Sequence, residues 1–215
     1  MPELVPIPSP GLPLQYGDAG NPLVVLVHDW YGRLPWLEPY ARALASRGLR
    51  VVVPDFYDGV ATTDSDDART LMLALDLQKS LTILDDVVDR ARFEGSEKVG
   101  LVGFSMGGWL ALLHAQGGSA DAVVAYYSSL GPDDHGVIPA PVYLHFAETD
   151  DWDDGEEPQA FIARLKEHGT PVTDRTYIGT KHSFANASLP GKIDANAAAL
   201  AFGRTASFLE SHLVD

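Results

Sequence analysis

The chain has 215 residues, 46% of them hydrophobic, which is enough for one α/β domain with a substantial core and tight for two. Its 30 acidic residues outnumber its 15 lysines and arginines, so the formal net charge is −15. Nucleic acids and anionic membranes bind positive surfaces, and this balance argues against both as partners. Without cysteine, the chain can have no disulfide, thiolate metal site or cysteine nucleophile. We expect one domain over residues 1–215.

The N-terminal stretch carries no lysine or arginine before Arg33 and is interrupted by prolines. It therefore lacks both the basic and the unbroken apolar region of a secretory signal peptide. No stretch approaches the roughly 18 apolar residues of a membrane span. These features predict a soluble cytoplasmic protein, and we expect it to be a monomer or a homodimer.

Short apolar runs rich in valine recur along the chain. Runs of this kind predict strands that are buried on both faces of a sheet. The predicted strands, after a short edge strand at Leu14–Tyr16, are Leu23–Val27, Arg50–Val53, Val99–Val102, Ala122–Tyr127, Val142–Ala147 and Val172–Ile178.

Segments with helical periodicity separate these strands. The predicted helices are Pro35–Arg47, a long region from Asp66 to Phe93 that kinks or splits near Ala74 to Gln78, Met106–Ala115, Pro158–His168 and Ala195–Leu213 behind a cap at Asp194. Strands that alternate with helices indicate crossover units. The predicted fold class is therefore α/β, with a mostly parallel central sheet and helices on both faces.

Residues 98–114, KVGLVGFSMGGWLALLH, join a strand, a sharp turn and a helix without a break. The turn has the sequence G-x-S-x-G, with Ser105 at its centre. Small residues two positions before and after the serine let neighbouring backbones pass close by, and the helix N-terminus favours developing negative charge. We predict that Ser105 is a nucleophile. The alternative is a glycine-rich strand–helix connection without a catalytic role.

A serine nucleophile requires a histidine base and an acid that orients the base. In α/β-hydrolase topology the chain order is serine, acid, histidine, which leaves His168, His182 and His212 of the seven histidines. His168 lies at a predicted helix end and His212 inside the last helix, where the helix dipole explains a basic side chain. His182 follows a predicted strand directly, so we predict that it is the base.

The acid must come from an acidic segment, residues 148–157, in which seven of ten residues are Asp or Glu. Most of these must be solvated, because several ionised carboxylates cannot share one buried pocket. Asp150 is best placed to turn back toward the serine, since Asp151 would point elsewhere and Glu148 is nearly on the strand. A calcium loop starting at Asp150 fails because Trp152 occupies its second ligand position. A looser cation site stays open, but we expect no metal and no cofactor.

An oxyanion hole needs two backbone N–H donors. One is expected from Met106, the residue after the nucleophile. The other is expected from the loop after Leu23–Val27, where we choose Trp30. Asp29 lies beside it, and its simplest role is to brace this loop.

Together these segments resemble the dienelactone hydrolase family of α/β-hydrolases over nearly the whole chain. The segments that carry the resemblance are His28–Gly32, Val53–Tyr57, Lys98–Gly108, Ala125–Tyr127, His145–Asp150 and His182–Ala185. The resemblance implies an α/β-hydrolase fold without a lid domain and a catalytic triad of Ser105, Asp150 and His182. It also implies that Trp30 and Met106 provide the oxyanion donors.

Three positions depart from the pattern of family members that act on dienelactone. Those members carry cysteine where this chain has Ser105, and a glutamate that interacts with the thiol where it has Asp29. They bind the substrate carboxylate with arginines, one of them four residues after the catalytic histidine, where this chain has Asn186. Arg69 lies near another expected arginine without matching its position.

These features predict a serine hydrolase that cleaves small carboxylic esters or lactones through an acyl-enzyme on Ser105. An acyltransferase or peptidase would use the same groups. A binding module that kept the fold without catalysis is the alternative from a different class, because fold does not establish function.

Overall fold

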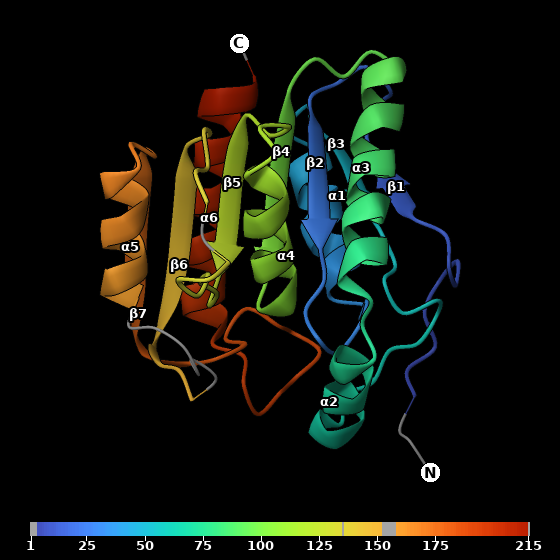
Figure 1. The fold of residues 1–215 in the computed structure, drawn as a ribbon. Coiled ribbons are helices and arrows are strands. Elements are labelled where there is room, and N and C mark those ends of the chain that lie inside the picture. The colour runs from blue at the N-terminus through green and yellow to red at the C-terminus, as the bar shows by residue number, and fades with distance from the viewer. Residues whose placement is uncertain (1–3, 135, 152–157, 215) are drawn as a thin grey trace.

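The computed structural model describes residues 4–134, 136–151 and 158–214. These residues form a seven-stranded sheet with the order β1-β3-β2-β4-β5-β6-β7 (Figure 1). Strand β1 pairs antiparallel with β3, and every other pair is parallel. The strands are β1 Leu14–Tyr16, β2 Leu23–Val27, β3 Arg50–Val53, β4 Val99–Phe104, β5 Ala122–Tyr126, β6 Val142–Thr149 and β7 Val172–Lys181.

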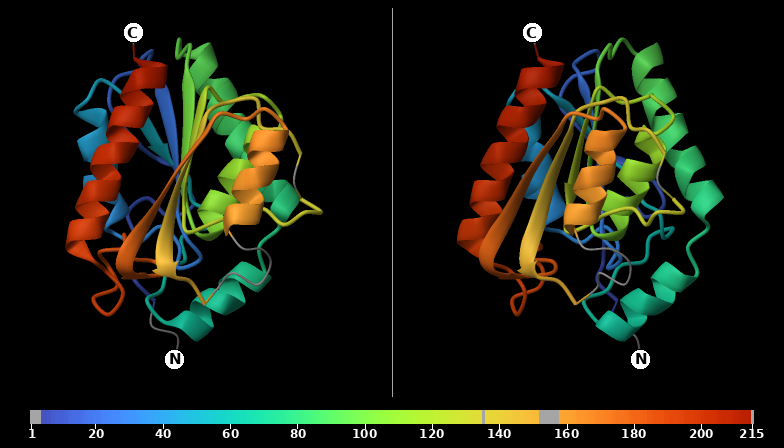
Figure 2. Two further views of the ribbon diagram at one scale, coloured as in Figure 1. Left: turned by 90° about the vertical axis from the view of Figure 1, so that its left-hand side faces the viewer. Right: turned by 60° about the vertical axis from the view of Figure 1, so that its left-hand side comes forward.

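Helices cover both faces of this sheet, as predicted. Helices α1 and α6 lie on one face, and α3, α4 and α5 lie on the other (Figure 2). The short helix α2 stands beyond the carboxyl ends of the parallel strands (Figure 1). The helices are α1 Leu37–Ala45, α2 Ser65–Leu73, α3 Leu77–Phe93, α4 Met106–Ala115, α5 Pro158–Glu167 and α6 Ala195–Leu213.

The α/β-hydrolase fold predicted from the sequence is confirmed. Within the described part of the chain, no separate lid domain covers the carboxyl edge of the sheet (Figure 1). The same residues include no helix that is long and apolar enough to cross a membrane.

Capping residues explain where the predicted long helical region splits. The Asp64 side chain accepts hydrogen bonds from the N–H groups of Asp66 and Asp67, which starts α2. The Asp76 side chain accepts one from Lys79 and starts α3. An aspartate at the N-cap satisfies backbone donors that have no intrahelical partner. The predicted cap at Asp194 is also confirmed, because its side chain accepts from Ala197 N–H.

The predicted ends of strands β6 and β7 were too early by two and three residues. Both strands continue past a register shift, so that Thr149 pairs with Lys181. The ladder adds backbone hydrogen bonds that periodicity does not reveal. Asp150 and His182 directly follow this pair, so they leave the sheet side by side.

A buried polar chain links the sheet to helix α6 across the core. Tyr126 Oη bonds to Tyr40 Oη at 3.1 Å and to Thr205 Oγ1 at 2.7 Å. Thr205 Oγ1 also bonds to His145 Nε2 at 2.9 Å, and His145 Nδ1 bonds to Tyr177 Oη at 2.7 Å. Burial lowers the pKa of His145 to about 3, so this imidazole is neutral near pH 7.

Thr205 tests the contribution of this chain to stability. We expect Thr205→Val to lower the free energy of unfolding by about 1 to 3 kcal/mol, because at nearly unchanged volume it removes the partner of His145 Nε2 and one of the two partners of Tyr126 Oη. Urea denaturation at pH 7 measures the change. Thr205→Ser keeps the hydroxyl and is the matched control. A Val variant as stable as the Ser variant would contradict the expectation.

Candidate active site

Ser105 occupies a strained turn between β4 and α4. Its backbone has φ 52° and ψ −118°, a left-handed φ that non-glycine residues rarely adopt. Hydrogen bonds to β5 and α4 hold this conformation, since Ser105 N–H donates to Tyr126 O at 2.9 Å and Trp109 N–H donates to Ser105 O at 3.0 Å. This conformation lifts the serine side chain above the end of β4.

The turn exists only because two glycines allow backbones to touch. A Cβ built on Gly103 would lie within 3.0 Å of the backbone of Gly107. A Cβ built on Gly107 would collide in the same way with the carbonyls of Val27 and His28. The helix α4 is thereby packed directly against the end of β2, next to the loop that carries Trp30.

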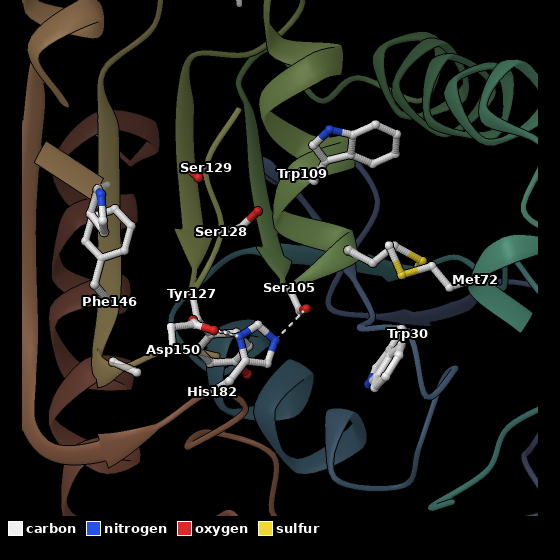
Figure 3. A pocket seen from close by; sticks show the side chains of 13 residues that line it. Trp30, Met72, Ser105, Trp109, Tyr127, Ser128, Ser129, Phe146, Asp150 and His182 are labelled. Carbon is white, nitrogen blue, oxygen red and sulfur yellow. Dashed lines mark hydrogen bonds and ion pairs between the residues drawn. The ribbon is translucent and has the colours of Figure 1, made fainter. Parts of the chain in front are cut away.

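The structure brings Ser105, His182 and Asp150 together in one hydrogen-bonded chain. Ser105 Oγ lies 2.7 Å from His182 Nε2 (Figure 3). His182 Nδ1 lies 2.8 Å from each carboxylate oxygen of Asp150. Because an ionised carboxylate only accepts hydrogen bonds, Nδ1 is the donor, and Nε2 is left to accept the serine proton.

The two rejected histidines lie elsewhere. His212 is in the last turn of α6, where its Nδ1 bonds to Phe208 O at 2.8 Å. His168 follows α5, and its N–H donates to Arg164 O. Neither histidine lines the cleft around Ser105.

Both predicted oxyanion donors line the same cleft as Ser105. Met106 is the first residue of α4, a position whose N–H has no partner within the helix. Its sulfur accepts a hydrogen bond from Tyr57 Oη at 3.0 Å, which helps to fix the side chain. Trp30 lies across the cleft from the serine, at the end of β2 (Figure 3). The cleft has a volume of about 160 Å³.

Asp29 and Asn186 form a buried link between the Trp30 loop and the His182 loop. Both side chains are fully buried, and Asn186 Nδ2 donates to Asp29 Oδ2 at 2.7 Å. Asp29 Oδ1 accepts the N–H of Tyr31 at 3.0 Å, so the carboxylate closes a turn around Trp30. Burial raises the pKa of Asp29 to about 6, while the amide of Asn186 opposes the shift. The sequence suggested a brace at Asp29 but gave no sign of its partner.

His28 connects the Trp30 loop to the segment that follows β3. Its Nδ1 donates to Asp29 O at 2.7 Å, and its Nε2 accepts the N–H of Phe56 at 3.2 Å. Burial lowers the pKa of His28 to about 4, so the ring is neutral and serves as a fixed spacer.

The sequence predictions missed several residues that line the cleft, Ser128 and Ser129 among them. Tyr127 leaves β5 with φ 39°, and its ring packs 4.8 Å from the His182 ring between centroids. Trp109, Met72 and Phe146 contribute apolar surface from α4, α2 and β6 (Figure 3). The position of Tyr127 after a buried strand is a signal that could have found it. Trp109, Met72 and Phe146 read as ordinary core or surface residues.

The structure gives no support to Arg69 as a cleft residue or, among the described residues, to a metal site. Arg69 is exposed on α2 and does not line the cleft. Within the described ranges, no group of three or more His, Asp or Glu side chains is arranged to hold a metal ion. Most of the acidic segment, residues 152–157, lies outside the described residues, and with it the remaining cation-site hypothesis.

Residues 14–213 match the dienelactone hydrolase family. A putative carboxymethylenebutenolidase of Azospirillum brasilense is 30% identical over 214 residues, covering 92% of this chain and 90% of the relative. The carboxymethylenebutenolidase of Pseudomonas putida is 28% identical over 221 residues, with 89% and 86% covered. Among solved structures, a dienelactone hydrolase-like promiscuous phosphotriesterase from metagenomic libraries superposes with a TM-score of 0.79 at 20% identity, covering 91% of this chain and 88% of that one.

A pair of glycine substitutions tests the packing of the turn. We expect Gly107→Ala to destabilise the protein by about 3 kcal/mol or more, because the added methyl group meets backbone that cannot move aside. Gly203→Ala is the matched control, since a Cβ there has no neighbour within 4 Å. This control should gain about 0.5 to 1 kcal/mol from helix propensity. Thermal denaturation of both variants measures the difference, and equal melting temperatures would contradict the predicted clash at Gly107.

Proposed function

The chain belongs to the dienelactone hydrolase family, and we propose that it hydrolyses carboxylic esters or lactones with Ser105 as the nucleophile. The observation that carries the proposal is the hydrogen-bonded chain from Ser105 through His182 to Asp150. A serine hydroxyl becomes a useful nucleophile when a base stands within hydrogen-bond reach and a third group orients that base. Both distances support the proposal: His182 Nε2 lies 2.7 Å from Ser105 Oγ, and His182 Nδ1 lies 2.8 Å from the Asp150 carboxylate.

The first half of the reaction acylates the serine. Ser105 Oγ attacks the ester carbonyl carbon while His182 Nε2 takes the hydroxyl proton. The Asp150 carboxylate keeps the ring in the correct tautomer and stabilises the imidazolium. When the tetrahedral intermediate collapses, the bond from carbonyl carbon to alcohol oxygen breaks, and His182 returns its proton to that oxygen.

The second half releases the acyl group. Water attacks the acyl-enzyme carbonyl while His182 again takes a proton, and the bond to Ser105 Oγ then breaks with return of that proton to the serine. The products are a carboxylic acid and an alcohol, or a hydroxy acid when the substrate is a lactone. The N–H groups of Met106 and Trp30 are assigned to the oxyanion that forms in each half.

Asp29 is assigned a positioning role. Its two oxygens are tied to Tyr31 N–H and to Asn186, so it fixes the loop of Trp30 relative to the loop of His182. Its negative charge also lies near enough to His182 for the two to interact electrostatically, which favours the imidazolium of the transition state.

Ser105→Ala tests the nucleophile. We expect this variant to lose ester hydrolysis by several orders of magnitude, about 10⁶-fold where a full triad operates. A fluorophosphonate probe should label the wild type at Ser105 and leave the variant unlabelled. Ser46→Ala removes an exposed serine hydroxyl at the C-cap of α1, outside the cleft, and is the control. Near wild-type turnover in Ser105→Ala would exclude the mechanism, and an unreactive but folded wild type would favour the binding module.

Asp29→Asn separates positioning from general stability. A carboxyl whose pKa rises from 3.8 to about 6 on folding costs stability above pH 6 and costs nothing below pH 4. The stability of the variant relative to wild type should therefore increase between pH 4 and pH 8, by on the order of 3 kcal/mol. In the same variant, kcat should fall by up to about 100-fold relative to wild type, which is the cost of losing one oxyanion donor.

Chemical denaturation at the two pH values and ester kinetics at pH 8 provide both readouts. A stability difference between variant and wild type that does not change with pH would contradict the raised pKa of Asp29, and a variant that loses stability but keeps kcat would point to a purely structural role. Unchanged kcat in a folded variant would exclude the positioning role.

A further inference from the structure

Resting on the proposed function, we propose that the natural substrates are uncharged esters or lactones whose acyl group is short and apolar. The acyl group is the part of the substrate that stays bonded to Ser105 after the alcohol leaves. It must therefore fit the cleft around that oxygen, and the walls of this cleft decide which acyl groups are accepted.

Besides the triad side chains and the hydroxyl groups of Ser128 and Ser129, the walls of the cleft are apolar. Trp109 on α4 and Met72 on α2 form one side, and Phe146 on β6 faces them across the cleft (Figure 3). Phe146 is only 6% exposed, whereas Met72 is 42% exposed at the rim. Covering such surface with a hydrocarbon chain removes apolar area from water, which favours binding. A cleft volume of about 160 Å³ favours an acyl chain of a few carbons.

No lysine or arginine side chain lines this cleft among the described residues. Asn186 is fully buried and donates to Asp29, so its amide faces away from the substrate. Lys192 is held by Tyr31 Oη at 3.0 Å. The stretch between Asp151 and Pro158 contains no basic residue in its sequence. A carboxylate on the acyl chain would therefore enter the cleft without a cation to pair with.

The local charge also opposes an anionic substrate. Asp150 lines the cleft, and the carboxylate of Asp29 lies buried beneath the Trp30 loop. Both charges repel a second anion, and the net charge of −15 adds a repulsive field at long range. Desolvating an unpaired carboxylate in an apolar cleft adds a further cost.

Two esters of equal length test the proposal. We expect kcat/KM for 4-nitrophenyl butyrate to exceed that for 4-nitrophenyl hydrogen succinate by at least about 30-fold, because the terminal methyl group of one is a carboxylate in the other. Their leaving groups are identical, so the ratio reports on the acyl chain once the enzyme-free rate of each ester is subtracted, which for the succinate includes attack of its own carboxylate on the ester carbonyl. Equal values, or a preference for the succinate ester, would overturn the proposal.

A variant at the cleft rim provides a second test, because the same two esters are compared in variant and wild type and their intrinsic reactivities cancel. Met72→Lys places a cation on an exposed position, where the long side chain can reach the cleft while its head stays solvated. We expect this variant to raise the succinate-to-butyrate ratio at least about 10-fold at low salt, and the gain should shrink at high salt. Met72→Gln, of similar size but uncharged, is the matched control and should leave the ratio unchanged.

The proposed function and the acyl preference fail in different ways. If neither ester is cleaved and the fluorophosphonate probe does not label Ser105, the hydrolase mechanism is wrong. If both esters are cleaved at similar rates and Ser105 is labelled, the mechanism stands and the acyl preference is wrong. A Met72→Lys variant with the wild-type ratio would also contradict the preference, since it would show that charge at this wall does not reach the substrate.

Discussion

The close approach of backbones at the serine turn is the constraint on which the site depends. Gly107 lies against the carbonyls of Val27 and His28, and Gly103 lies against Gly107. This contact seats α4 on the carboxyl end of β2 and forces Ser105 into its left-handed conformation. The same contact brings the first turn of α4 next to the loop that follows β2. The same packing contact thus positions Ser105 and the loop that carries Trp30.

A second constraint, the paired ends of β6 and β7, supplies the other half of the site. Thr149 pairs with Lys181 beyond a register shift, so the pairing of β6 with β7 extends two residues past Ala147 on β6. Asp150 and His182 follow directly, and their side chains meet because their backbones already do. The proposed acid and base are therefore positioned by the end of a sheet ladder, which is more rigid than a loop.

Buried polar groups then connect these two halves. Asp29 and Asn186 join the loop after β2 to the loop after β7. An ionised carboxylate buried with an amide partner is costly, which is consistent with the raised pKa of Asp29. A residue that costs stability and yet holds a catalytic loop is typical of a functional site. The cleft above it is apolar and carries negative charge nearby, which together disfavour anionic acyl groups.

The sequence by itself determined the strand and helix order, the turn at Ser105 and the chain order of Asp150 and His182. These depend on local properties: apolar periodicity, glycine at fixed spacing and capping aspartates. Only the tertiary structure decided the ends of β6 and β7, the pairing of Asp29 with Asn186, and the walls from Met72, Trp109 and Phe146. Each of these joins residues far apart in the chain, and no local pattern encodes which distant side chain will lie opposite another.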